Sequence, residues 1–253
     1  MSLYRNGQGM TQHSLIFRSV GRTHQGLVRK LNEDVFLERP DIGLWMVADG
    51  MGGHNKGDVA ASMIAEVFGH IKGGAGAPAL AEAVRNTIDT QNLTLYTMGA
   101  SLGADRTMGA AVVSLIMADG AWCCHWVGDS RAYRYADGRL TQLTRDHSLV
   151  QEMVDAGKLT AEEAEGHPMR NVITRAVGAD RTINIASLSG DVTVGDRFLV
   201  CTDGVTTMCD DDDIAAILGE ADLDIVADQL VDAVLKRGAR DNLSFVLVDV
   251  AAG

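Results

Sequence analysis

Apolar residues recur every three or four positions in three segments of the chain, and this spacing predicts three amphipathic helices. In segment 58–71 the apolar stripe opposes a polar one, and it consists of Val59, Met63, Val67 and Ile71. The second helix follows Pro78 and the third lies near the C-terminus, with apolar positions at Leu80, Val84, Ile88 and Leu95, and at Leu223, Val226, Leu230 and Val234. Each helix therefore has one face to bury against another layer.

The other apolar runs are short and rich in β-branched or aromatic residues, which is typical of strands. They lie at 44–48, 111–118, 121–127, 131–135, 197–202 and 243–250. Asp119-Gly120 and Asp137-Gly138 separate neighbouring runs and predict hairpin turns. Because strands follow in hairpins and helices come in blocks, the pattern favours antiparallel sheets with helices outside them over alternating βαβ units.

The stretch 144–180 interrupts the strand pattern and predicts two short helices, at 147–157 and 160–165. Thr160 and Glu163 have the spacing of a capping box at the start of the second. The chain has 253 residues, only three prolines and no Ser/Gly linker. We therefore expect a single domain over 14–250, preceded by a polar tail at 1–13 that is disordered or left from cloning.

Charge and composition exclude several classes of function. Lys and Arg number 22 against 34 Asp and Glu, a net charge of −12, whereas nucleic acids and anionic membranes require a basic face. No apolar run approaches the roughly 18 residues of a membrane span, and no C-x-x-C pair occurs among the four cysteines. We expect reduced cysteines, a cytoplasmic location, and neither nucleic-acid binding nor membrane insertion.

The positions of five aspartates are the most informative feature. Asp49, Asp129 and Asp203 follow apolar strands, Asp241 comes just before one, and Asp34 begins another. If these strand ends meet at one edge, the carboxylates face each other and cannot all stay ionised without cations. Oxygen ligands of this kind suit Mg²⁺ or Mn²⁺. An Asp-Gly pair after one strand is often only a turn, but four such acids on apolar strands favour a metal site.

The segment 49–54 adds a glycine-rich turn, because Gly50, Gly52 and Gly53 surround Met51 and precede His54. Glycine lets the backbone approach a ligand closely. The segment lies between a predicted strand and the helix at 58–71, which favours a binding site over a plain linker. A backbone carbonyl here is a candidate metal ligand.

Six short motifs occur in order along the chain. They are GLVRKLNED (26–34), VADGMGGH (47–54), VGDSRAY (127–133), LTRDHS (143–148), TDGV (202–205) and ARDNLS (239–244). With this order and spacing, over residues 14–250, the chain resembles the metal-dependent protein phosphatases of type 2C (the PPM family), in their compact bacterial form. The resemblance implies an α+β fold, with a central antiparallel β-sandwich flanked by helix pairs (α-β-β-α layers) and a flap at about 144–180.

The resemblance also implies a dinuclear Mn²⁺ or Mg²⁺ centre at one end of the sandwich. By motif, Asp49 bridges the two ions, the Gly50 carbonyl binds the second, and Asp203 and Asp241 hold the first. Asp129, together with Asp203, resembles the pair that holds a third, weaker ion.

Two further residues have implied roles in catalysis. Asp34 resembles the acid that hydrogen-bonds metal waters, and Arg29 resembles the arginine that grips the substrate phosphate. The implied reaction is hydrolysis of phosphoserine and phosphothreonine by a water activated between two ions. No covalent intermediate is needed, and neither Cys123 nor Cys124 has the arginine of a cysteine-phosphatase loop six positions later. The implied partner is a phosphorylated protein, either a Ser/Thr kinase or one of its targets.

The chain departs from the family pattern at two places. Ala110-Ala111 stands where the family has hydroxyl residues after Met-Gly, and Met51 stands where animal members have a histidine thought to protonate the leaving group. The general acid therefore stays open between His54 and a metal-bound water.

Other readings of the same residues stay open. His147 and His167 are more often structural than catalytic, and the acidic run 210–213 more often complements a helix dipole than binds metal. A pseudophosphatase, or a phosphoesterase acting on nucleotides or small phosphates, is the rival function. Activity on a phosphopeptide compared with a nucleotide separates these alternatives.

Overall fold

The strands of the molecule form two five-stranded antiparallel sheets in the computed structural model, which describes residues 15–52, 56–74, 76–103 and 108–253. The first sheet has the order β1-β10-β9-β6-β7, with β1 (Leu15–His24), β10 (Leu243–Ala252), β9 (Arg197–Cys201), β6 (Arg131–Ala136) and β7 (Arg139–Gln142). The second has the order β2-β3-β4-β5-β8, with β2 (Asp34–Arg39), β3 (Leu44–Met51), β4 (Gly109–Ala118), β5 (Ala121–Val127) and β8 (Ala186–Asp191). The tail expected at 1–13 lies outside the described residues.

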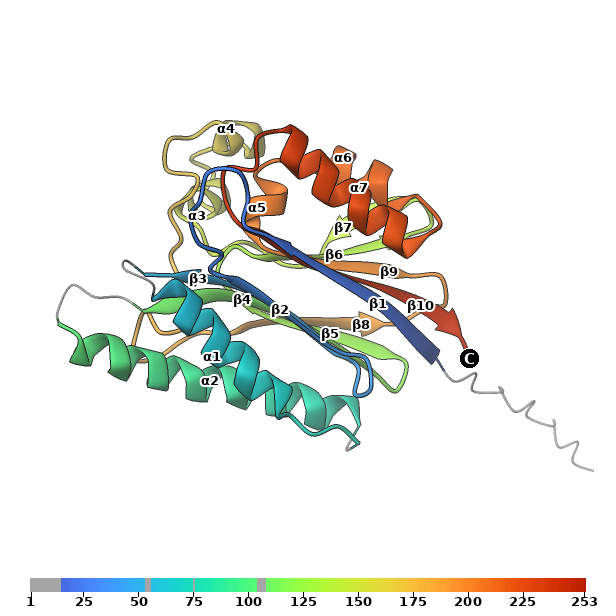
Figure 1. Cartoon of the computed structure of the whole chain (residues 1–253), viewed down its shortest axis with the longest axis horizontal. Coiled ribbons are helices and arrows are strands. Elements are labelled where there is room, and N and C mark those ends of the chain that lie inside the picture. The colour runs from blue at the N-terminus through green and yellow to red at the C-terminus, as the bar shows by residue number, and fades with distance from the viewer. Residues whose placement is uncertain (1–14, 53–55, 75, 104–107) are drawn as a thin grey trace, which may run out of the picture.

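Helices cover the outer faces of both sheets, which confirms the predicted α-β-β-α layers (Figure 1). The second sheet packs against α1 (Gly57–Gly69) and α2 (Ala77–Ser101), and the first against α6 (Asp211–Leu218) and α7 (Leu223–Lys236). The short helices α3 (Leu149–Asp155), α4 (Ala161–Glu165) and α5 (Asp203–Thr206) lie towards one end of the sandwich (Figure 1). No helix within the described ranges is both long and apolar enough to cross a membrane.

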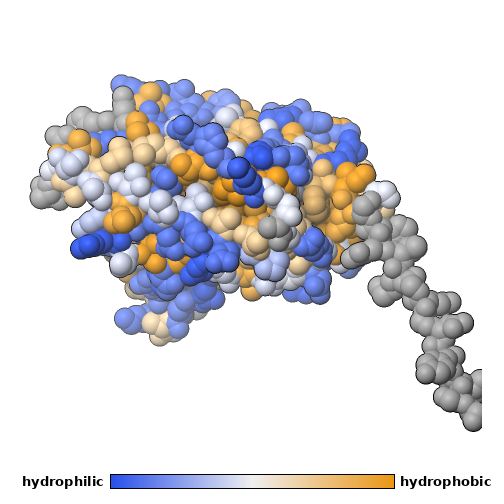
Figure 2. Space-filling model, turned by 90° about the horizontal axis from the view of Figure 1, so that it is seen from below, coloured by the Kyte–Doolittle hydropathy of each residue, from blue (hydrophilic) through white to orange (hydrophobic). Residues whose placement is uncertain are grey.

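The core is divided by the two sheets. In β3, Trp45 and Val47 face the opposite sheet, whereas Leu44, Met46 and Ala48 pack against the layer of α1 and α2. The strand is therefore buried on both faces, which explains why its apolar residues form a continuous run rather than alternating with polar ones. The side of the molecule that carries α1 and α2 shows hydrophilic residues interspersed with smaller apolar areas (Figure 2).

The predicted apolar stripe of the first helix is confirmed in part, because it borders the buried face instead of forming its centre. The buried positions of α1 are Gly57, Ala60, Ala61, Ile64 and Phe68, and Val59 is 41% exposed. A four-residue spacing advances about 40° around the helix at each step. The stripe therefore starts in solvent at Val59 and turns towards the core, where Met63 and Val67 are partly buried and Ile71, just after the helix, is 8% exposed. Small alanines instead let α1 approach the sheet closely. The faces predicted for α2 and α7 are confirmed.

Local turn and cap signals are confirmed. The backbone has positive φ at both residues of each predicted hairpin turn, with 55° and 78° at Asp119-Gly120 and 52° and 76° at Asp137-Gly138. Thr160 and Glu163 form the predicted capping box of α4.

The strands β1 and β8 were not predicted, because both are edge strands with exposed polar positions and lack a continuous apolar run.

A buried arginine ties the first sheet to its helical layer. Arg197 on β9 pairs with Asp249 on β10 at 2.5 Å and donates to the carbonyls of Leu218 at 2.8 Å and Glu220 at 2.5 Å. These carbonyls lie at the C-terminal end of α6, where helix carbonyl groups lack intrahelical partners.

Substitution of Arg197 by Leu is expected to lower the free energy of unfolding by about 3 kcal/mol, because it leaves the buried carbonyl of Leu218 and the partly buried acceptors of Asp249 and Glu220 without this donor. The matched control is Arg22→Leu, whose partners Asp224 and Asp228 are 77% and 72% exposed; it should cost less than about 1 kcal/mol. Urea denaturation measures both, and equal losses would contradict the role assigned to Arg197.

Candidate active site

Acidic residues from five separate segments meet at one end of the sandwich. Asp34 begins β2 and lies directly opposite Asp49 across the antiparallel pair with β3. Asp129 follows β5, Asp203 begins α5, and Asp241 precedes β10. All five segments reach the end that carries the short helices α3 and α4 (Figure 1). The structure thus brings together the five aspartates that the sequence singled out.

The carboxyl groups raise one another's pKa. Burial, then the charges of Asp203 and Asp241, raises the pKa of Asp34 to about 7. Burial, then the charge of Asp203, raises the pKa of Asp129 to about 8, and burial with the charge of Asp241 raises that of Asp203 to about 6. The pKa of Asp49 lies well above its usual value, through burial and the charges of the other four. These acids can be fully ionised near neutral pH only where positive charge offsets their repulsion.

Two glycines allow the acid-bearing segments to come this close. A Cβ atom at Gly204 would lie 1.8 Å from the backbone oxygen of Asn242, so Asp203 is held beside the segment of Asp241. Gly26 has a φ of 79°, and a Cβ atom there would lie 2.2 Å from the backbone oxygen of Asp241. Only glycine fits at these contacts. Both residues lie within sequence motifs, at 26–34 and 202–205, but the sequence predicts no role for either.

The peptide group of Gly50 is wedged between two other segments. Its N–H donates to the carbonyl of Glu33 at 3.0 Å. A Cβ atom at Gly50 would lie 2.0 Å from the backbone oxygen of Gly57, and one at Gly57 would lie 2.6 Å from the Gly50 oxygen. The candidate backbone ligand is therefore held in place by Glu33, just before β2, and by the start of α1. Gly57 was not identified from the sequence, where it shows no signal except its place before a helix.

Two buried polar residues support the acids and were missed by the sequence analysis. Asn242 accepts from the backbone N–H of Glu33 at 2.9 Å and donates to the carbonyls of Gln25 and Leu31, both at 2.8 Å. Thr202 donates its hydroxyl to Asp34 at 2.8 Å. Asn242 therefore fastens the loop between β1 and β2 to the segment that carries Asp241, and Thr202 fixes the buried carboxyl of Asp34.

Arg29 lies on that loop, at the mouth of the acidic cluster. Its Nη2 contacts Oδ2 of Asp241 at 2.5 Å, and this hydrogen bond is the main reason that the pKa of Arg29 is raised. The charge of Asp49 contributes as well. The side chain is 53% exposed, so it can reach a ligand at the cluster from solvent. Its position is not that of an isolated surface cation.

The donor set fits hard divalent cations, because it consists of carboxylates and one backbone carbonyl. Within the described ranges, no three His, Cys, Asp or Glu side chains converge as a ready-made metal cage. The carboxylate of Asp241 already has two partners, since its Oδ1 accepts from the N–H of Asn242 and its Oδ2 from Arg29. An ion bound through Asp241 would therefore share or replace the contact with Arg29.

His147 is a structural support beside Asp129. Its ring stacks on Trp126 with centroids 6.2 Å apart, and its Nδ1 accepts from the N–H of Gly128 at 3.1 Å. Burial lowers the pKa of His147 to about 4, so the ring is neutral. His167 accepts from the N–H of Met169 within a flap turn. Neither contact involves the acidic cluster.

The other open assignments are placed as follows. Asp210 and Asp213 form a capping box at the start of α6, which accounts for the acidic run. Ala111 lies opposite Asp49 in the sheet, and Gly128 packs against its methyl group, so the departure from the family pattern borders the site. His54 lies outside the described residues.

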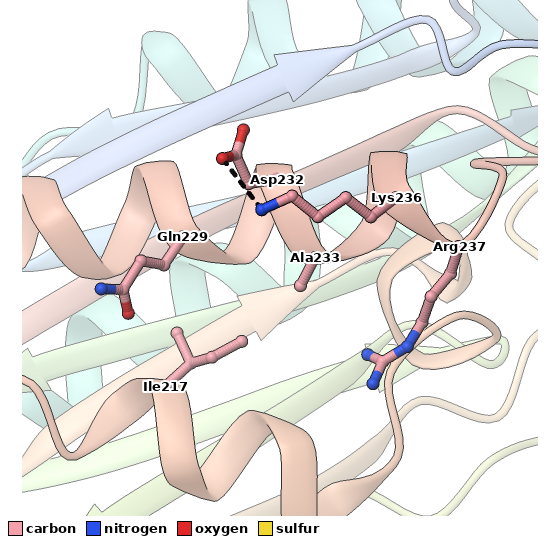
Figure 3. Close-up of a pocket in the computed structure, with 6 residues that line it drawn as sticks. All are labelled: Ile217, Gln229, Asp232, Ala233, Lys236 and Arg237. Carbon is pink, nitrogen blue, oxygen red and sulfur yellow. Dashed lines mark hydrogen bonds and ion pairs between the residues drawn. The ribbon is translucent and has the colours of Figure 1, made fainter.

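A groove of about 960 Å³ is lined by Asp129 and Asp203 of the acidic cluster, by Arg170 and Asn171, and by the residues of the α6 cap. A second hollow, of about 330 Å³, lies between α6 and α7 and contains none of the candidate acids (Figure 3). It is lined by Ile217, Gln229, Asp232, Ala233, Lys236 and Arg237. The groove, which opens on the carboxylates, is therefore the candidate substrate site.

The comparisons with known proteins agree with this geometry. The family model described as protein phosphatase 2C matches residues 21–247. The chain is 31% identical over 241 residues to the serine/threonine protein phosphatase PstP of Mycobacterium tuberculosis, covering 95% of this chain and 46% of PstP. It is 33% identical over 236 residues to the serine/threonine phosphatase stp of Listeria monocytogenes, covering 90% of this chain and 94% of stp. The chain thus spans about half the length of PstP.

Solved structures show the same fold. PppA, described as a key regulatory component of the T6SS in Pseudomonas aeruginosa, superimposes with a TM-score of 0.86 at 36% identity, covering 94% of this chain and 100% of PppA. The catalytic domain of PstP in complex with two manganese ions superimposes with a TM-score of 0.82 at 31% identity, over 94% of this chain and 100% of that one. The predicted α+β fold class is confirmed.

The family match covers most of the chain, and the relatives share both its sequence and its fold. The motifs that carry this likeness include all five aspartates of the cluster. The chain therefore belongs to the protein phosphatase 2C family, the metal-dependent PPM class of phosphoprotein phosphatases.

Proposed function

We propose that this chain hydrolyses phosphoserine and phosphothreonine in proteins, with two Mn²⁺ or Mg²⁺ ions in its core site and room for a third. The observation that carries the proposal is the gathering of aspartates from five distant segments, whose carboxyl groups raise one another's pKa. Family membership supports it, since the relatives PstP and stp are serine/threonine phosphatases.

The aspartates and one backbone carbonyl are the proposed metal ligands. Asp49 would serve both core ions, with Asp203 and Asp241 on the first and the Gly50 carbonyl on the second. Asp129 would join Asp203 at a third, weaker ion. When bound, such ions lower the pKa of a water molecule and withdraw charge from phosphate oxygens.

Arg29 and Asp34 are the proposed catalytic side chains that are not ligands. The planar guanidinium of Arg29 can donate to two phosphate oxygens at once and so orient the phosphate for in-line attack. Asp34 is buried beside Asp49, where it can accept a hydrogen bond from the attacking water. Met51 has no proton to donate, so we propose that either His54 or a metal-bound water would protonate the leaving oxygen.

The proposed substrates are phosphorylated proteins, either a bacterial Ser/Thr kinase or the targets of such a kinase. We also propose that residues 14–250 form one catalytic domain with its flap at about 144–180, and that the protein acts in the cytoplasm. The groove along the flap supports the assignment of this segment to the substrate side of the site.

The direct test compares a phosphothreonine peptide with a nucleotide, with Mn²⁺ supplied. Wild-type protein should cleave the peptide, and Asp203→Asn should lower kcat by about three orders of magnitude or more without unfolding the protein, because it removes a proposed ligand. The matched control is Asp191→Asn, an exposed acid at the far end of β8, which should retain full activity. Cleavage of the nucleotide alone, or full activity of Asp203→Asn, would refute the proposal.

Replacement of Arg29 separates phosphate binding from metal binding. Arg29→Ala should raise KM for the phosphopeptide about tenfold or more, because the planar donor pair is lost. It should not weaken Mn²⁺ binding, since the substitution frees Oδ2 of Asp241. Arg29→Lys keeps the positive charge but loses the planar pair of donors, so its KM should lie between those of Arg29→Ala and the wild type. Steady-state kinetics and Mn²⁺ calorimetry provide both values, and an unchanged KM would place Arg29 outside the substrate site.

Metal removal should make stability fall with pH. In the metal-free protein the pKa values of Asp34, Asp129 and Asp203 are about 7, 8 and 6, above those of an unfolded chain. The folded state then binds more protons than the unfolded state from about pH 4 to 8, so the free energy of unfolding decreases as pH rises. Thermal melts in EDTA should show this decline, which Asp203→Asn should reduce and Mn²⁺ at pH 8 should reverse. A flat profile with no Mn²⁺ effect would contradict the cluster.

A further inference from the structure

The loop between β1 and β2 presents apolar side chains to solvent on both sides of Arg29. Leu27 is 63% exposed, Val28 is 65% exposed and Leu31 is 46% exposed. Isolated apolar residues on a surface need no explanation, but three within five positions form a patch, and such patches mark contact surfaces. We call Leu27, Val28 and Leu31 the apolar rim.

The apolar rim belongs to a firmly held loop. The N–H of Leu27 donates to the carbonyl of Ala239 at 2.9 Å, and Asn242 donates to the carbonyls of Gln25 and Leu31. The loop is thus fixed to the segment before β10 at several points along its length. Its apolar side chains are held outward by this backbone, and the exposure is a stable property of the surface.

The position of Arg29 identifies the occupant. Arg29 lies next to Val28 and reaches Asp241 at the acidic cluster. A polypeptide advances at most about 3.3–3.6 Å per residue. When the phosphate of a phosphorylated protein meets Arg29, residues within two or three positions of the phosphorylated one are therefore close enough to contact the apolar rim. Small phosphate esters and nucleotides have no flanking side chains to place there.

The two sides of the site differ in chemistry. The groove along the flap is lined by charged side chains such as Asp146, Arg170 and Asp212, and it is more polar than apolar. The residues of the apolar rim are not among those that line this groove, and they lie beside Arg29 on the loop between β1 and β2. A flanking apolar side chain would remove surface from water at the rim but would face charged groups in the groove.

We propose that the apolar rim binds apolar residues that flank the phosphorylated serine or threonine, and so selects among protein substrates. This inference rests on the proposed function of the site. It assigns Leu27 and Val28 a role in specificity, separate from the binding of phosphate by Arg29. It also predicts that phosphopeptides with leucine, valine or phenylalanine beside the phosphorylated residue are better substrates than those with serine or glycine there.

The test measures kcat/KM for three substrates: a phosphothreonine peptide with apolar flanking residues, the same peptide with Ser and Gly flanks, and p-nitrophenyl phosphate. The double variant Leu27→Ser/Val28→Ser should lose the preference for apolar flanks, with a fall of roughly five- to tenfold on the first peptide relative to the other two substrates. The matched control is Val194→Ser, which changes a residue that is 50% exposed between β8 and β9. It should keep the wild-type preference.

The outcomes separate the inference from the function beneath it. Equal losses on all three substrates, or an unchanged preference, would overturn the role of the apolar rim and leave the phosphatase activity standing. A wild-type chain that cleaves p-nitrophenyl phosphate but neither peptide would overturn the proposed function and the inference together. The variant Leu27→Met/Val28→Ile keeps the surface apolar and should retain the wild-type preference. This result would exclude misfolding of the loop as the cause of the loss in the serine variant.

Discussion

Repulsion among carboxylates at one end of the sandwich is the constraint on which the rest of the structure depends. The strands beneath that end are buried on both faces, and their packing holds the acids together against this repulsion. The cost appears as raised pKa values in Asp34, Asp49, Asp129 and Asp203. Cations relieve this repulsion, so the arrangement of acids at the strand ends favours the binding of cations.

The proposed sites for metal and for phosphate depend on one scaffold. Asn242 holds the loop of Arg29 to the segment of Asp241, and Arg29 itself contacts Asp241. Gly26 and Gly204 remove the side chains that would separate these segments. A shift in this scaffold would therefore move the proposed phosphate ligand and a proposed metal ligand together. The apolar rim belongs to the same fixed loop, which places any selection of substrate beside the chemistry.

The sequence predicts the parts of the site that have local signals. Asp49 and Asp203 follow apolar strands and precede glycine, and this pattern is readable without a structure. The roles of Asn242 and Thr202 are not readable, because their partners lie about 170 residues or more away along the chain. The same distinction holds for the fold. Hairpins and caps depend on neighbouring residues and are confirmed, whereas the buried face of α1 depends on the sheet that it meets.

The most direct test is the position of the metal itself. A crystal of the wild-type protein soaked in Mn²⁺ should show two strong anomalous peaks, about 3.5–4 Å apart, bounded by Asp49, Asp203 and Asp241. Asp241 should then have exchanged or shared its contact with Arg29. Anomalous peaks elsewhere on the molecule, or none at this end of the sandwich under saturating Mn²⁺, would contradict the account.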